Sequence, residues 1–157
     1  MLKEYLITAF LSLLPVSELR GAIPYAFAVG IPLPVAYFYC VFFNALVGPI
    51  AFIFLTFFHK LFYKWKFYAN LFDKLVTRAR NKVHVYVEKY GMFGIYCFVA
   101  IPFPLTGAWT GTLGAWILGL SKRKTLLSVL FGVITSGLIV SLIIGLGLGI
   151  SIFVKQL

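Results

Sequence analysis

Residues 15–24 read Pro15-Val16-Ser17-Glu18-Leu19-Arg20-Gly21-Ala22-Ile23-Pro24, inside sequence that is otherwise apolar enough for a lipid bilayer. The stretch holds a carboxylate, a guanidinium and two prolines, which we expect to break a helix. An ionisable side chain at membrane depth costs about 2.5–3.5 kcal/mol on insertion scales, so it persists where it faces a cavity, a partner or a substrate. The stretch therefore predicts a functional site. The alternative is that Glu18 and Arg20 only pair with each other near a membrane interface.

The composition is that of a membrane protein. Hydrophobic residues make up 62% of the 157 residues and charged residues 11%, against roughly 25% charged residues in a soluble domain. The mean hydropathy is +1.00. The length fits a single membrane domain over residues 1–157. The sequence contains no nucleophile–base pair, nucleotide-binding glycine loop or metal-ligand spacing, so we expect no enzyme, no cofactor and no metal site.

Uncharged segments divide the chain into five parts, which are residues 1–30, 31–58, 59–90, 91–121 and 122–157. The first apolar run is too short to span a bilayer, because spanning takes about 20 residues. The second part is long enough for a transmembrane helix, with an expected kink at Gly48-Pro49. The fourth is interrupted at Pro102 and Pro104. The fifth would be a helix longer than the hydrocarbon core, so we expect it to tilt or to bend near Gly145.

An ungapped shift of 89 residues pairs similar residues of the two halves. The pairs are Pro15 with Pro104, Ser17 with Thr106, Ala22 with Gly111, Ala26 with Ala115, and Gly30 with Gly119. This pattern favours an internal repeat. Chance similarity among abundant small residues is the alternative.

The basic residues distinguish between topologies. Eleven of the 14 lie either in the linker 59–90 or in Lys122-Arg123-Lys124. If residues 1–30 and 91–121 both crossed the membrane, these two clusters would lie on opposite faces, against the positive-inside tendency. If each enters and returns as a re-entrant hairpin, both clusters lie on the cytoplasmic face. A model in which only the first segment crosses also satisfies the charges, but it breaks the repeat.

The predicted fold is therefore an all-α integral membrane protein of the plasma membrane, with several membrane-inserted segments. It comprises two inverted repeats, each a re-entrant helical hairpin (1–30 and 91–121) followed by a transmembrane helix (31–58 and 122–157). The basic linker 59–90 repeats apolar residues every three or four positions, which is typical of one or two amphipathic helices lying in the interface. We expect it to contact anionic lipid headgroups rather than nucleic acid. Docking of this linker onto the protein's own helices is the alternative.

Re-entrant backbone is tolerated where protein or a cavity satisfies its polar groups, and transporters use such broken helices to bind substrate. We expect the two breaks to approach each other. Burial disfavours the charged form of a carboxyl and a nearby guanidinium favours it, so Glu18 is a candidate proton carrier. Arg20 offers a planar fork for phosphate or carboxylate. In the alternative structural role, Glu18 neutralises Arg20 or caps the helix that follows, and Ser17 is a second candidate cap.

The second break supplies the other candidate residues. Thr106, Trp109 and Thr110 carry groups that could bind a substrate oxygen or stack on it, although packing is the alternative for Trp109. Pro15, Pro24, Gly21, Pro102, Pro104 and Gly107 are the predicted structural breaks. Asn44 could line a path or bond a neighbouring helix. Small residues recur every four positions from Gly107 to Gly119 and from Gly137 to Gly149, which favours close helix packing within the chain, with a homodimer as the alternative.

Residues 14–24 and 101–111 together resemble the family of small multidrug export proteins, which is similar to the wider DedA/VTT superfamily, and the resemblance covers nearly the whole chain. It implies paired re-entrant hairpins and proton-linked transport of polyprenyl phosphate or another lipid, with Glu18 and Arg20 as a charged pair at a hairpin tip. The superfamily pattern also includes arginines in the second hairpin, and residues 91–121 contain none.

The leading hypothesis is a small proton-coupled transporter or flippase for an amphiphilic or lipid-phosphate substrate. Glu18 would carry the proton, Arg20 would contact the anion, and the second hairpin would complete the pocket. Multidrug efflux of lipophilic cations is one alternative, with Glu18 alternating between proton and drug. A non-transporting membrane scaffold is the other.

Overall fold

A computed structural model describes residues 1–58, 73–74, 77, 90–103 and 106–155. Its principal elements are α1 (Leu2–Leu13), α2 (Glu18–Ala28), α3 (Leu33–Ala45), α4 (Val47–Ile53), the π-helical turn η1 (Phe54–Phe58), α7 (Met92–Ala100), α8 (Ala108–Ile117) and α9 (Lys122–Lys155). The described residues contain helices and no strand, which confirms the all-helical prediction. Most of the linker 59–90 lies outside the described residues, and so does the prediction of an amphipathic linker.

Two helical segments are long and apolar enough to cross a membrane, namely Leu33–Phe57 and Lys122–Gly147. The first is interrupted at Leu46, whose N–H donates to the carbonyl of Phe43 at 3.2 Å. Three residues later Pro49 lacks the N–H that would bond the Ala45 carbonyl, which explains why the interruption lies just before the proline. In contrast, α9 continues through residues 145–149 without interruption, so the bend expected near Gly145 does not break the helix.

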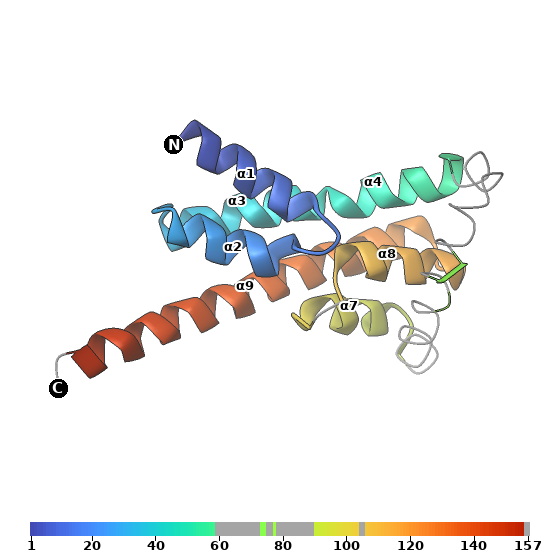
Figure 1. The fold of residues 1–157 in the computed structure, drawn as a ribbon. Coiled ribbons are helices and arrows are strands. Elements are labelled where there is room, and N and C mark those ends of the chain that lie inside the picture. Colours follow the sequence, from blue (N-terminus) through green and yellow to red (C-terminus); the bar gives the residue numbers. More distant parts are fainter. Residues whose placement is uncertain (59–72, 75–76, 78–89, 104–105, 156–157) are drawn as a thin grey trace.

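Helices α1 and α2 form one pair, and helices α7 and α8 form a second pair. In each pair the chain turns back on itself (Figure 1). In the first pair, Tyr5 near the start of α1 packs against Ala26 and Ile31 at the end of α2. In the second pair, α7 begins beside the start of α9, because the Ser128 hydroxyl donates to the Met92 carbonyl at 3.0 Å, and α8 ends just before α9. The connections 14–17 and 101–107 therefore lie at the far end of each pair.

The 89-residue shift holds for backbone hydrogen bonds as well as for residue types. At the end of α2, the N–H groups of Val29, Gly30 and Ile31 bond the carbonyls of Tyr25, Phe27 and Ala26. At the end of α8, the N–H groups of Leu118, Gly119 and Leu120 bond the carbonyls of Gly114, Trp116 and Ala115. Both ends have the Schellman pattern, with glycine at positive φ (+91° at Gly30, +70° at Gly119). The two halves thus share a local structure; their inverted arrangement in the membrane stays a prediction.

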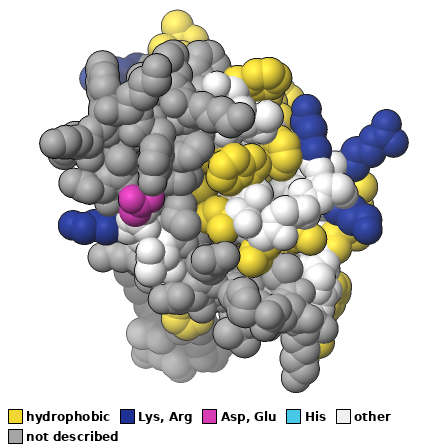
Figure 2. All heavy atoms as spheres, turned by 90° about the vertical axis from the view of Figure 1, so that its right-hand side faces the viewer, with side chains coloured by type: hydrophobic (Ala, Val, Ile, Leu, Met, Phe, Trp, Pro, Cys, Tyr) yellow, Lys and Arg dark blue, Asp and Glu magenta, His cyan; other side chains and the backbone are white. Residues whose placement is uncertain are grey.

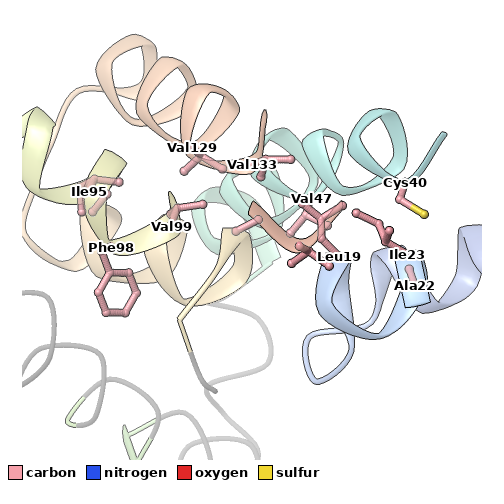
Figure 3. Packing of buried hydrophobic residues seen from close by; sticks show 13 residues of the cluster. Leu19, Ala22, Ile23, Cys40, Val47, Ile95, Phe98, Val99, Val129 and Val133 are labelled. Atoms are coloured by element: carbon pink, nitrogen blue, oxygen red, sulfur yellow. The ribbon is translucent and has the colours of Figure 1, made fainter. Parts of the chain in front are cut away.

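One hydrophobic core joins the two pairs. The first pair packs against α3 and the second against α4 and α9. Buried side chains of α2, α3, α4, α7, α8 and α9 belong to one cluster, and partly buried residues of α1 pack against it (Figure 3). Leu19, Val47 and Val133 lie in the middle of this cluster in Figure 3, between residues of the first pair and residues of the second. The shared core thus holds the α1–α2 connection close to the α7–α8 connection.

Small residues of α9 are used for packing within the chain. A Cβ added at Gly137 would lie 2.8 Å from Val41 Cγ2 and 3.1 Å from the Tyr37 ring, so α3 approaches α9 closely there. Asn44 donates to the Ser12 carbonyl at 2.7 Å, and of its two predicted roles it takes that of bonding a neighbouring helix.

Two of the predicted helix breaks are wrong. Pro24 and Gly21 both lie inside α2. Pro24 is exposed, and its ring removes one hydrogen bond, to the Arg20 carbonyl, without ending the helix. Gly21 lies in the first turns of α2 beneath the Ser17 side chain, which a Cβ at position 21 would meet. The two chain reversals lie elsewhere, at Pro15 before α2 and around Pro102 before α8, while Pro104 lies outside the described residues.

Basic side chains lie at the end of the molecule where α4 ends and α9 begins. Lys122, Arg123 and Lys124 are all exposed at the start of α9. Figure 2 looks at this end, and Lys and Arg side chains project from its edge. The chain also leaves for the linker 59–90 at this end (Figure 1).

Candidate functional site

The connection between α1 and α2 places Glu18 in an unusual backbone conformation. Glu18 is the first residue of α2 and has φ +46°, and no other non-glycine residue in the described part of the chain has a positive φ. An L-residue pays free energy for this conformation, which tends to be retained at functional sites. The residue is 4% exposed. The fold therefore holds a carboxylate in the interior by means of a strained turn.

The carboxylate of Glu18 binds the start of α8 in the other helix pair. Its Oε2 accepts from the backbone N–H of Ala108 at 3.3 Å and its Oε1 accepts from that of Trp109 at 3.2 Å. These N–H groups have no partner inside α8, and they form the positive end of its dipole. The alternative role predicted for Glu18, capping the helix that follows it, is therefore wrong, because its carboxylate caps α8 and not α2.

Gly107 leaves the space that the carboxylate fills. It has φ +151°, and a Cβ built on it would overlap the carboxylate of Glu18. Glycine is favoured here both by the backbone conformation and by this close approach. The predicted break at Gly107 thus coincides with the point where the two pairs touch.

Arg20 connects the same two segments. Its Nη2 lies 3.5 Å from Glu18 Oε2, and its Nη1 donates to the Phe103 carbonyl in the α7–α8 connection. The Arg20 side chain is 20% exposed and that of Glu18 6% exposed. The pair is thus largely removed from the surrounding medium, but the guanidinium keeps some access to it.

Trp109 completes the contact in the opposite direction. Its indole N–H donates to the carbonyl of Leu13, the last residue of α1, at 2.8 Å. The end of α1 and the start of α8 therefore satisfy polar groups of each other's helix pair. The Asn44 bond to Ser12 lies nearby in the chain, and Asn44 is near the middle of the span Leu33–Phe57. The contact between the pairs accordingly lies at mid-span.

The remaining predicted residues have more local roles. Thr106 Oγ1 lies 2.7 Å from the carbonyl oxygens of both Ile101 and Phe103, so it holds its own connection in shape. Ser17 precedes α2 without making a side-chain cap, and its buried hydroxyl has no hydrogen-bond partner among the described residues. Thr110 is half-buried in the first turn of α8.

Several partners in this site are backbone groups, and the sequence did not predict which backbone groups they would be. The carbonyls of Leu13 and Phe103 and the N–H of Ala108 are the partners of predicted side chains. The available signal was the break at residues 102–107 just before a helix start. In the described part of the chain, no three His, Cys, Asp or Glu residues gather as a metal site would require.

Together, the two apolar spans and the buried charged contact between broken helix pairs define a helical membrane protein. Residues 18–139 match the family described as "Putative small multi-drug export protein", and the chain belongs to this family. The match covers both Glu18 and the second break. No curated protein matches the chain, and no solved structure does.

Proposed function

We infer that the chain is a membrane transporter that moves an amphiphilic anion, such as a lipid phosphate, in exchange with or together with protons. The family description names export. The observation that carries the inference is the carboxylate of Glu18, which is buried and bound by α8 of the other helix pair. In this role Glu18 carries the proton and Arg20 contacts the anion, because a guanidinium stays charged and matches the geometry of phosphate.

The side chains at the two connections support re-entrant hairpins that end in hydrocarbon. Val16, at the tip of the first connection, is 89% exposed, and Phe103, at the tip of the second, is 67% exposed. Connections that face water normally carry polar side chains, whereas these expose large apolar ones. Their position at mid-span accounts for this, because lipid tails would surround them.

Protonation of Glu18 gives the transporter a switch. A neutral carboxyl accepts hydrogen bonds from N–H groups less strongly than a carboxylate does. Proton binding therefore weakens the bonds to Ala108 and Trp109 and frees the two helix pairs to move relative to each other. The two halves then rock about the site and expose it alternately to the two sides of the membrane.

The basic end of the molecule supports an orientation with this end in the cytoplasm of the cell. Lys122, Arg123 and Lys124 are exposed there, and anionic lipids attract such clusters by about 1 kcal/mol per residue near the surface. The linker 59–90 adds eight more basic residues. Anionic headgroups are therefore the expected lipid partners of this end.

Multidrug efflux of lipophilic cations is the second candidate, and the family description names multi-drug export. In that case Glu18 exchanges a proton for a drug cation. Arg20 opposes this use, because its positive charge lies 3.5 Å from the carboxylate that the drug would need.

Transport in proteoliposomes tests the proposal. Under a pH gradient, the wild type should move a labelled lipid phosphate, and Glu18→Gln should lose at least 90% of the gradient-driven rate. Glu4→Gln is the matched control, because Glu4 pairs with the N-terminus at the exposed start of α1. A Glu18→Gln rate equal to that of the wild type contradicts the proton role. Arg20→Ala is assayed for transport of both the lipid phosphate and a lipophilic cation. If it loses only cation efflux and still moves the lipid phosphate like the wild type, the anion role of Arg20 is contradicted.

A further inference from the structure

We propose that the Glu18 carboxylate occupies the binding site of the substrate's own oxyanion, so that the bound anion and the ionised Glu18 exclude each other. The inference rests on the proposed function and adds how the site is loaded. The ligand class is a phosphate monoester or a similar oxyanion. Glu18 is thus an internal occupant that leaves when the ligand arrives.

The first support is a fitted space at the start of α8. Two adjacent N–H groups, from Ala108 and Trp109, point at two oxygens of one carboxylate. Gly107 lets those oxygens approach the backbone closer than any residue with a Cβ would. The same combination of glycine and helix N-terminus binds phosphate oxygens in other proteins. The space is therefore shaped for an oxyanion, and Glu18 supplies one.

The second support is a set of further donors, from Arg20 beside that space and from Thr112 one turn into α8. Arg20 has five N–H groups, of which Nη1 bonds the Phe103 carbonyl and Nη2 lies near Glu18. Thr112 is 0% exposed, and its hydroxyl has no partner within the described part of the chain. It lies one turn after Ala108 on the same side of α8, and helical side chains tilt toward the N-terminus of their helix. A tetrahedral oxyanion could use donors that a planar carboxylate leaves unpaired.

Electrostatics makes the exclusion strong. An oxyanion bound to the same N–H groups would place a second negative charge within a few ångströms of an ionised Glu18, and two like charges so close together repel strongly where little water screens them. Loading therefore requires Glu18 to take up a proton from water and to leave the space. Proton and anion then enter together. When the anion leaves, Glu18 gives its proton back to water and the carboxylate returns to α8.

Binding of phosphate probes, measured by isothermal titration calorimetry on protein in nanodiscs, tests the exclusion without any transport assay. Dodecyl phosphate and inorganic phosphate are titrated separately, which distinguishes a lipid headgroup from a free phosphate. At neutral pH, Glu18→Ala should bind at least one probe ten times more tightly than the wild type does, and Glu18→Gln should lie between them. Glu4→Gln should bind like the wild type.

The double variant Glu18→Gln/Arg20→Ala should lose at least tenfold in affinity relative to Glu18→Gln, because the guanidinium would be missing. If Glu18→Ala fails to fold, the comparison of Glu18→Gln with the wild type decides alone. Equal affinity of these two for both probes overturns the proposal. If the affinities follow the predicted order but the wild type does not transport lipid phosphate, the proposed function is contradicted and the shared anion site is supported.

Discussion

At the scale of single residues, the sequence indicated the charged pair but not its partners. A carboxylate and a guanidinium in an apolar segment are visible in the sequence because they are expensive there. Their partners are backbone groups at Phe103, Ala108 and Trp109, and every residue has such groups. Only the three-dimensional arrangement selects which of them become a site. The positive φ of Glu18 was also hidden, because its side chain gives no sign of it.

A double-mutant cycle measures how strongly Glu18 and Arg20 depend on each other. Arg20→Ala leaves the buried carboxylate without its cation, so we expect a loss of about 3 kcal/mol in the free energy of unfolding. Adding Glu18→Gln to Arg20→Ala should restore at least about 1 kcal/mol, since the uncompensated charge is gone. Denaturant unfolding in mild detergent gives both values. Additive effects of the two substitutions would mean that the pair is not coupled.

At the scale of elements, the repeat was the most informative pattern. Residues separated by 89 positions predict two similar halves, and the ends of α2 and α8 and their capping hydrogen bonds follow the same shift. Pro24 and Gly21 were misleading, because residue type alone does not say whether neighbouring contacts keep a helix intact. Because α2 packs against α3, it stays helical through Gly21 and Pro24 and beyond them. The linker was predicted from its periodicity alone, and most of it lies outside the described residues.

Alanine substitutions at Gly107 and Gly119 distinguish the effect of the contact with Glu18 from the backbone cost of replacing a glycine at positive φ. Gly119→Ala places a Cβ in open space at φ +70° and should cost about 1–2 kcal/mol in the free energy of unfolding. Gly107→Ala carries a similar backbone cost and also collides with the Glu18 carboxylate, so its loss should exceed that of Gly119→Ala by at least about 1 kcal/mol. Thermal unfolding of the two variants side by side makes the comparison. Equal losses would show that Glu18 does not fill the space above Gly107.

Close packing of α3 on α9 predicts a second contrast. Gly137→Leu forces a side chain against Tyr37 and Val41, and such overpacking costs about 1–3 kcal/mol. Gly147→Leu adds the same side chain ten residues later, where nothing lies within 4 Å of a Cβ, so it should be nearly neutral. The temperature of unfolding reports the difference. If both variants behave alike, α9 does not pack closely against Tyr37 and Val41 at Gly137.

At the scale of the whole molecule, the transport mechanism depends on how deep in the membrane the charged contact lies. Composition predicted a membrane protein, and the distribution of basic residues predicted which segments turn back. The sequence also predicts that the two breaks approach each other, and the bonds from Ala108, Trp109 and Arg20 join them. The energetics explain why. Each connection carries polar groups that lipid cannot satisfy, and the two connections satisfy a share of each other's.

Depth measurement by electron paramagnetic resonance tests this claim most directly. Cys40 and Cys97 are first replaced, and single cysteines are then introduced one at a time for spin labelling. Two of them replace Val16 and Phe103, the exposed tips. The third replaces Pro32, which is exposed just before α3. In bilayers, the labels at Val16 and Phe103 should collide readily with oxygen and rarely with a water-soluble nickel complex, as expected near the bilayer centre, whereas the label at Pro32 should show the reverse. A label at Val16 or Phe103 as accessible to the nickel complex as the one at Pro32 would place that tip in water, and would contradict a charged contact held halfway through the membrane.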